Sequence, residues 1–178
     1  EETILTVSAS GVLTNDSDVD TTANLTVSDS DTVSLMGASV VVTTDGGYTY
    51  NPTSATALQA LNQGLTTTDT FTYDIVDQHG ASASATVTIT VTGVNDTPIA
   101  TSDTRLIAED TIFPLSASGF LTNDSDVDTP ANLTVSDSDT VSLMGSRVVV
   151  TTDGGYTYNP TRATALHALT QGLTTPHP

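Results

Sequence analysis

The feature that most constrains this chain is an internal duplication. Residues 8–67 and residues 116–175 share one sequence with seven differences, at a constant offset of 108 residues. Solenoid repeats have periods of roughly 20–50 residues, whereas a period of about one hundred fits one whole all-β domain. The duplication therefore predicts a modular chain in which each copy folds as a domain of its own.

The second copy ends before a stretch that the first copy contains. Residues 71–92 (FTYDIVDQHGASASATVTITVT) have no counterpart, because the sequence ends at Pro178. We expect a complete repeat over residues 1–94, a linker and lead-in over residues 95–108, and a truncated repeat over residues 109–178. Without the hairpin of residues 71–92, the second copy exposes an apolar face and open strand edges. Three readings stay open: an arbitrary end of the sequence, completion by strands from another molecule, and a poorly folded last third.

Alternation with a period of two dominates the apolar pattern. In residues 86–92 (TVTITVT), valine and isoleucine face one side and threonine the other, and such β-branched residues favour strands. About seven short strands per copy predict an all-β fold of tandem immunoglobulin-like β-sandwiches. One short helix per copy is also expected, over residues 54–63 in the first. The other expected strands of the first copy are residues 4–8, 25–27, 40–44, 48–50 and 71–75.

The charge balance excludes several kinds of partner. Three Lys and Arg residues stand against 21 Asp and Glu residues, which gives a formal net charge of −18. Nucleic-acid binding needs a basic face that follows the phosphates, and an anionic membrane surface repels such a chain, so we expect neither nucleic acid nor membrane insertion. The absence of Cys excludes disulfides and thiolate metal sites.

The most informative polar motif is Asn-Asp-Ser-Asp-Val-Asp, which begins at Asn15 and returns at Asn123. Its carboxylates at positions i, i+2 and i+4 project to one side of an extended backbone. Calcium takes roughly six to eight oxygen ligands and would relieve the repulsion between these carboxylates. A solvated acidic turn is the alternative reading. The candidate calcium ligands of the motif are Asp16, Asp18 and Asp20 in the first copy and Asp124, Asp126 and Asp128 in the second.

Two parts of the sequence resemble known repeat families. Residues 57–100 (ALQALNQGLTTTDTFTYDIVDQHGASASATVTITVTGVNDTPIA) are similar to the VCBS repeat of large bacterial surface and secreted proteins. The opening AEDT, the loop LTNDSDVD and the closing VNDTP resemble bacterial cadherin-like domains of the same proteins. The resemblance implies cadherin-like β-sandwiches, type I secretion, calcium at the domain poles, and roles in adhesion and biofilm at the bacterial cell surface.

The resemblance also implies further calcium ligands near a junction between copies. They are two residues of the linker, the acidic pair that opens the second copy, and two acids after the FTY strand: Asn95, Asp96, Glu109, Asp110, Asp74 and Asp77. Glu1 and Glu2 open the first copy in the same way as Glu109 and Asp110 open the second. On this basis we expect a calcium-stabilised spacer of a bacterial extracellular adhesin or biofilm-matrix protein.

Two other functions stay open. One is a calcium-dependent module that binds surface polysaccharide, although the chain has no Trp for an aromatic platform. The other is a self-assembling subunit in which the open edge of the second copy pairs with a neighbouring copy of the chain. An enzyme is not expected, because no Gly-x-Ser-x-Gly motif occurs and the three histidines (His79, His167 and His177) suggest no catalytic arrangement.

Overall fold

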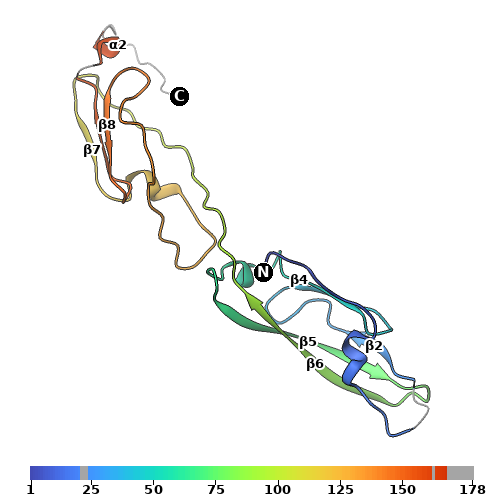
Figure 1. Cartoon of the computed structure of the whole chain (residues 1–178). Helices are drawn as coiled ribbons and strands as arrows, with labels where there is room; N and C mark the ends of the chain where they lie inside the picture. The colour runs from blue at the N-terminus through green and yellow to red at the C-terminus, as the bar shows by residue number, and fades with distance from the viewer. Residues whose placement is uncertain (21–23, 162, 168–178) are drawn as a thin grey trace. The chain divides into compact units, whose positions relative to one another are not determined.

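A computed structural model describes residues 1–20, 24–161 and 163–167. Its contacts divide the chain into two compact units. Unit 1 comprises Glu1–Asp96 and the short segment Val127–Pro130, and unit 2 comprises Thr97–Asp126 and Ala131–Pro178. Both units are built from β-strands with a few short helical turns (Figure 1). Residues 168–178 of the expected truncated repeat lie outside the described part.

Unit 1 is a β-sandwich of two antiparallel sheets with three strands each. One sheet has the order β1-β4-β3 and the other the order β2-β5-β6. The expected all-β fold is therefore confirmed, and the described residues of the complete copy form six strands where about seven were expected. The strands are β1 (Leu5–Val7), β2 (Thr26–Ser30), β3 (Ser39–Val42), β4 (Tyr48–Asn51), β5 (Thr66–Val76) and β6 (Ser82–Thr92).

The long hairpin of β5 and β6 forms most of the second sheet. Its eleven residue pairs run from Thr66 opposite Thr92 to Val76 opposite Ser82. Eleven residues of strand span about 36 Å at roughly 3.3 Å per residue, so the two ends of the hairpin lie at opposite ends of unit 1 (Figure 1). In the second half of β6 the valines and isoleucine are buried or half-buried and the threonines between them are exposed, as the alternation predicts.

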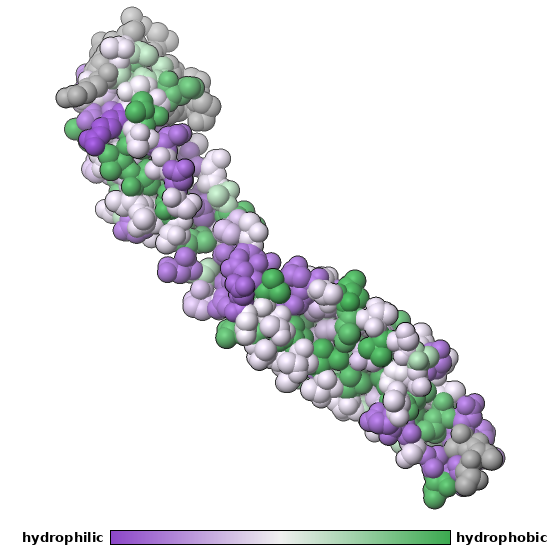
Figure 2. All heavy atoms as spheres, viewed as in Figure 1, coloured by the Kyte–Doolittle hydropathy of each residue, from purple (hydrophilic) through white to green (hydrophobic). Residues whose placement is uncertain are grey.

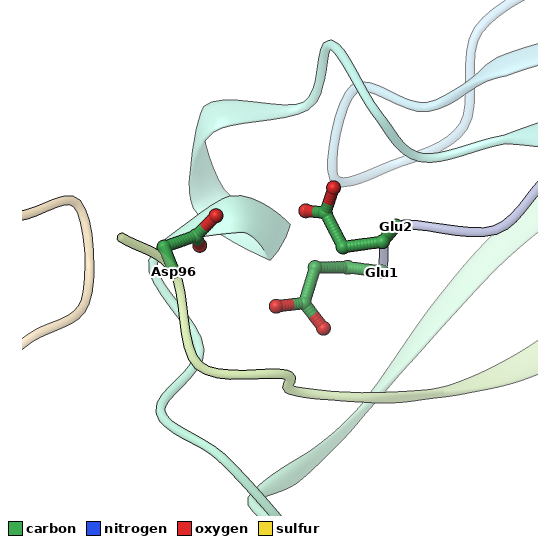
Figure 3. Close-up of side chains that lie close together, drawn as sticks. All are labelled: Glu1, Glu2 and Asp96. Carbon is green, nitrogen blue, oxygen red and sulfur yellow. The ribbon is translucent and has the colours of Figure 1, made fainter. Parts of the chain in front are cut away.

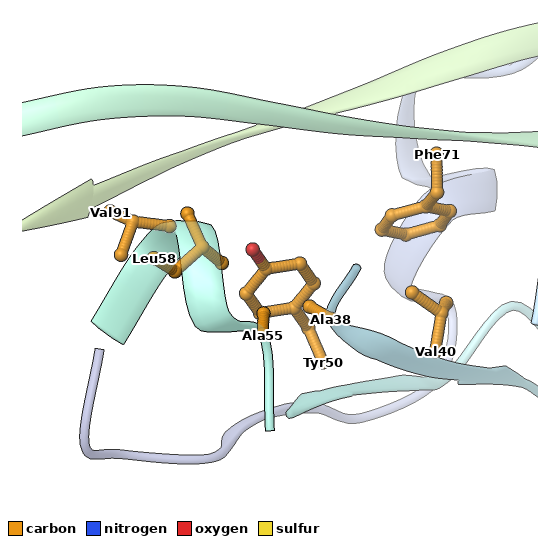
Figure 4. Close-up of a cluster of buried hydrophobic side chains, with 7 residues drawn as sticks. All are labelled: Ala38, Val40, Tyr50, Ala55, Leu58, Phe71 and Val91. Carbon is orange, nitrogen blue, oxygen red and sulfur yellow. The ribbon is translucent and has the colours of Figure 1, made fainter. Parts of the chain in front are cut away.

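The core of unit 1 lies between the two sheets. Val40 of β3 and Tyr50 of β4 pack with Phe71 of β5 and Val91 of β6 (Figure 4). Leu58 of the short helix α1 (Thr56–Gln59) closes this cluster beside Val91. These five side chains are each at most 5% exposed, so the core depends on residues from both sheets.

A second buried cluster lies closer to the turn of the hairpin. It joins Val12 of the 3-10 helix η1 (Gly11–Asn15), Val27 of β2 and Tyr73 of β5. The hydroxyl of Tyr73 donates a hydrogen bond to the carbonyl oxygen of Val12 at 3.0 Å. This bond satisfies the one polar atom that the tyrosine carries into the core.

Helix α1 is shorter than the helix expected at residues 54–63, and it contains Thr56–Gln59 only. The chain turns again directly after it. The amide of Leu65 donates to the carbonyl of Asn62 at 3.0 Å, and the amide of Gly64 donates to the carbonyl of Gly93 at 2.9 Å. These bonds end the helical path and direct the chain into β5. None of the described helices is long and apolar enough to cross a membrane.

Unit 2 repeats five elements of unit 1 at the offset of 108 residues. Strands β7, β9 and β8 form one antiparallel sheet in this order, with the register of β1, β4 and β3. The described part of unit 2 contains no strand that corresponds to β2, β5 or β6. The five elements are β7 (Phe113–Leu115), η2 (Gly119–Asn123), β8 (Arg147–Val150), β9 (Tyr156–Asn159) and α2 (Thr164–His167).

The difference at β2 arises between identical sequences. Residues 26–30 and residues 134–138 both read TVSDS, but only the first segment pairs with β5 and forms a strand. A strand needs a partner for its N–H and C=O groups. The described part of unit 2 provides no such partner for residues 134–138.

Candidate metal centre

One end of unit 1 brings the start of the chain to the end of β6. The amino group of Glu1 donates to the carbonyl oxygen of Thr92 at 2.9 Å. The amide of Val94 donates to the Glu1 carboxylate, with both carboxylate oxygens at 2.9 Å from the nitrogen. Glu1 is 8% exposed, so these bonds hold its carboxylate in a fixed, nearly buried position.

Three carboxylates meet at this end of unit 1. Glu1, Glu2 and Asp96 each offer an oxygen atom, and these atoms lie within 4.8 Å of one another. Figure 3 shows the three side chains close together, with Asp96 on the segment that follows β6. Calcium binds oxygen at about 2.3–2.6 Å, so two ligands of one ion lie at most about 5 Å apart. The three oxygens are therefore close enough to bind a single ion, and we term them the candidate centre.

The main chain of Asp96 is held by two hydrogen bonds, one to the carboxylate of Asp128 and one from the side chain of Asn95. Its amide donates to Oδ2 of Asp128 at 3.1 Å, and Asp128, in the Val127–Pro130 segment of unit 1, is 7% exposed. The side-chain amide of Asn95 donates to the carbonyl of Asp96 at 2.5 Å. The Oδ2 atom of Asp96 is buried and has no hydrogen-bond partner among the described residues. Such an atom costs free energy that a bound cation would offset.

No lysine or arginine of unit 1 balances these charges. Residues 1–96 contain twelve Asp and Glu residues and no Lys or Arg. The first arginine in the sequence, Arg105, forms an ion pair with Asp103 at 3.5 Å. Carboxylates within a few ångströms repel one another unless a positive charge lies between them. The arrangement of charges is therefore one that a divalent cation stabilises.

The two acids after the FTY strand lie at the opposite end of unit 1. Asp77 lies in the turn between β5 and β6, where its carboxylate accepts from the amides of His79 and Ala81, each at 2.8 Å. Burial raises the pKa of Asp77, but the amide bonds outweigh it and hold this pKa below its ordinary value. Asp74 accepts a hydrogen bond from the hydroxyl of Ser84. The structure does not bring these two acids to the candidate centre.

The first aspartate loop also lies toward the turn of the hairpin. Both carboxylate oxygens of Asp16 lie within hydrogen-bond distance of the Tyr73 hydroxyl, at 3.0 and 3.1 Å, so its single proton is shared with the carbonyl of Val12. Burial, followed by this bond, raises the pKa of Tyr73 to about 12. Asp18 and Asp20 are exposed, and the amide of Asp20 donates to Asp18 at 2.8 Å. Asp16 therefore contacts Tyr73 and positions its ring in the core.

The predicted ligands of unit 2 form no comparable centre among the described residues. Asp124 accepts a hydrogen bond from the amide of Thr101 at 2.7 Å. Asp126 and Glu109 are half-buried, and Asp110 is exposed. Of the predicted ligands, the structure thus places only Asp96 in the candidate centre, with Asp128 beside it.

Sequence reasoning missed Glu1 and Glu2 as members of the candidate centre. The offset of 108 residues aligns them with Glu109 and Asp110, which the resemblance marks as ligands. The repeat therefore carried the signal. The sequence alone does not show that the start of unit 1 lies beside the segment after β6.

Comparison with known families covers both units. The family model for a bacterial cadherin-like domain matches residues 1–93, and the family model for a cadherin-like domain matches residues 94–165. No curated protein matches the chain. The expected resemblance to cadherin-like domains is confirmed, whereas the resemblance to the VCBS repeat stays a prediction.

Proposed function

The chain belongs to the family of bacterial cadherin-like domains, and from this premise we propose that it is a calcium-stabilised spacer of a bacterial extracellular adhesin or biofilm-matrix protein. Domains of this family are structural and adhesive repeats and are typically not enzymes. The observation that carries the proposal is the meeting of Glu1, Glu2 and Asp96 within 4.8 Å in a unit without lysine or arginine.

The donor set of the candidate centre fits calcium. All three groups are carboxylates, and calcium prefers hard oxygen ligands, whereas zinc sites are usually built from His and Cys. Glu1 is already held by the amide of Val94 and Asp96 by its bond to Asp128, so an ion meets groups that are partly positioned. A bound calcium ion would supply positive charge in a unit that has no lysine or arginine side chain. Backbone carbonyls and water would complete its coordination.

An ion at the candidate centre would join distant parts of unit 1. Glu1 and Glu2 begin the unit, and Asp96 lies on the segment that leaves it after β6. A shared ion would therefore tie the start of the unit to its exit and resist opening of the sandwich at this end. This is the property that a spacer domain on a cell surface needs.

The aromatic residues give no support to a carbohydrate-binding module. Sugar-binding platforms use exposed aromatic rings, yet none of the eight aromatic residues of the chain, all within the described part, is exposed. On the face shown in Figure 2, near-white and green residues are mixed over both units, with purple residues in small groups. A surface rich in hydroxyl groups and acids suits a soluble spacer.

The proposal is tested by thermal unfolding of the chain in excess calcium, in excess magnesium and in chelator. A ligand that binds only the folded state raises the free energy of unfolding, by about 2.7 kcal/mol at a hundredfold excess over its dissociation constant. We expect a rise of several degrees with calcium and little change with magnesium, which demands stricter octahedral geometry. Equal melting temperatures in all three conditions would falsify the calcium part of the proposal.

Matched variants assign the effect to the candidate centre. Glu2→Gln and Asp96→Asn each remove one carboxylate with little change in shape, so each should reduce the calcium-dependent rise. Asp29→Asn removes an exposed carboxylate from β2, outside the centre, and should leave the rise unchanged. If all three variants respond to calcium like the unaltered chain, the ion binds elsewhere.

A further inference from the structure

The turn that precedes β3 places a methionine against the core of unit 1. Met36 is half-buried, and its side chain packs against the buried cluster that contains Val40 and Leu58. Its sulfur accepts a hydrogen bond from the hydroxyl of Thr67, with 3.9 Å between the sulfur and the oxygen. Because Thr67 alternates in phase with Phe71 on β5 and is itself half-buried, the sulfur lies at the rim of the core.

The same turn holds the buried carboxylate of Asp69. The amide of Met36 donates to Oδ1 of Asp69 at 2.8 Å, and the hydroxyl of Ser34 donates to Oδ2. The hydroxyl of Tyr50 and the amide of Thr70 donate to the same carboxylate. Asp69 is 0% exposed, so it depends on these bonds in place of water. A shift of the turn would therefore take donors away from a buried charge.

The two methionines are the only sulfur-containing residues of the chain. Met36 and Met144 lie in segments of identical sequence, residues 24–37 and 132–145, and the chain has no Cys and no Trp. Mild peroxide therefore has two principal targets, because the thioether of methionine is readily oxidised. Oxidation turns a flexible apolar side chain into a polar one that disrupts packed contacts.

We propose that Met36 is a modification site for peroxides, at which oxidation of the thioether to a sulfoxide loosens unit 1. The sulfur attacks one oxygen of hydrogen peroxide, an S–O bond forms as the O–O bond breaks, and the departing oxygen takes up the protons and leaves as water. The sulfur loses two electrons and the peroxide gains them. A methionine sulfoxide reductase reverses the step with two electrons from thiols, which become a disulfide.

The position of Met36 converts this local change into a loss of stability. A sulfoxide oxygen needs hydrogen bonds that an apolar cluster does not provide, so the oxidised side chain turns toward solvent. The backbone of the turn moves with it, because the side chain and the amide that binds Asp69 belong to one residue. Asp69 then loses a donor, and its remaining bonds link the two sheets less firmly.

The test compares the whole chain before and after treatment with mild hydrogen peroxide, at one fixed calcium concentration. Mass spectrometry of peptic fragments locates the added oxygen, since residues 1–96 contain no Lys or Arg for trypsin to cut. We expect oxidation at Met36 and a fall of roughly 4–8 °C in the melting temperature of unit 1, which hydrogen exchange of β5 assigns. The amides of Met36 and Thr70, which bind Asp69, should exchange faster. Treatment with methionine sulfoxide reductase should restore the original values.

Matched variants separate the two methionines. Met36→Leu keeps an apolar side chain of similar volume without the sulfur, so peroxide should leave the melting of its unit 1 unchanged. Met144→Leu keeps the proposed site and should respond to peroxide as the unaltered chain does. Met36→Gln introduces a polar group at the same position and should lower the melting temperature of unit 1 without peroxide.

Three outcomes would overturn the proposal. The first is oxidation of Met144 while Met36 stays reduced. The second is a Met36 sulfoxide whose unit 1 melts at the temperature of the unaltered chain, with no faster exchange at Met36 and Thr70. The third is an equal loss of stability in peroxide-treated Met36→Leu, since the sensitive residue would then lie elsewhere.

Discussion

At the scale of single residues, the buried carboxylate of Asp69 links the two sheets of unit 1 through hydrogen bonds. It lies on β5, is 0% exposed, and accepts through one oxygen the hydroxyls of Ser34 and Tyr50, the latter at 2.6 Å. Its other oxygen accepts the amides of Met36 and Thr70, each at 2.8 Å. Burial raises the pKa of Asp69, but these hydrogen bonds outweigh the burial and hold the pKa below its ordinary value. The ionised form is therefore the one that stabilises the fold.

Asp69→Asn should destabilise unit 1 by about 2–3 kcal/mol at neutral pH, because an amide group cannot accept on both sides and leaves a buried donor unsatisfied. The unfolded carboxyl has a pKa of about 3.9. Since the folded pKa is lower, the stabilisation is fully present above about pH 4 and is lost as the pH falls through the folded pKa. Denaturant unfolding at pH 7, 5 and 3 should show the gap between Asp69→Asn and the unaltered chain narrowing at pH 3. A gap that is constant with pH would mean that the charge of Asp69 is not what stabilises the fold.

The roles of acidic residues could be predicted from the sequence better in loops than in strands. The linker motif marked Asp96, and the repeat aligned Glu1 and Glu2 with a predicted acidic pair. Asp69 went unnoticed, although it alternates in phase with Phe71 and Tyr73 and therefore faces the core. An acid in such a phase is a signal for a buried network. The two hydroxyls that donate to Asp69 come from residues 19 and 35 positions away in sequence, and only the fold brings them together.

At the scale of elements, local sequence explains the hairpin but not β2. The alternation of β5 and β6 predicts strands in any context, because each supplies a partner for the other. The TVSDS segment is a strand in unit 1 and is irregular in unit 2 with no change in sequence. Its structure depends on pairing with β5, a long-range contact that no local pattern encodes.

The exchange of Val12 for Phe120 between the units leads to a paired prediction. In unit 2, Phe120→Val removes a stacked ring from Tyr156 and should cost about 1–3 kcal/mol. In unit 1, Val12→Phe forces a larger ring into a site where Val12 is 5% exposed and should also cost about 1–3 kcal/mol. Hydrogen exchange of each unit measures both. If either substitution is neutral, the two cores are more alike than their packing indicates.

At the scale of the whole molecule, buried apolar side chains are divided unequally between the units. Among the described residues, ten of the buried apolar residues belong to unit 1 and two, Ala163 and Leu166, belong to unit 2. Because burial of apolar surface dominates stability, we expect two unfolding transitions in chelator, with unit 2 melting first. Calorimetry counts the transitions, and hydrogen exchange during heating assigns them. A single transition in which both units lose protection together would contradict this expectation.

The excess of acids over the molecule predicts opposite effects of one substitution with and without calcium. A net charge of −18 destabilises the compact state by self-repulsion, and sodium chloride at about 0.5 M should relieve part of it by shortening the Debye length. Glu2 is exposed and lies within the candidate centre. In chelator, Glu2→Gln removes repulsion and should melt at or above the temperature of the unaltered chain. In calcium, Glu2→Gln removes a ligand and should melt below the temperature of the unaltered chain.

The two melting curves therefore exchange order when calcium is added, which neither screening nor a purely structural role of Glu2 would produce. If sodium chloride alone reproduces the whole calcium effect, the ion acts by screening, and if Glu2→Gln is equally destabilising in both conditions, Glu2 supports the fold without binding the ion.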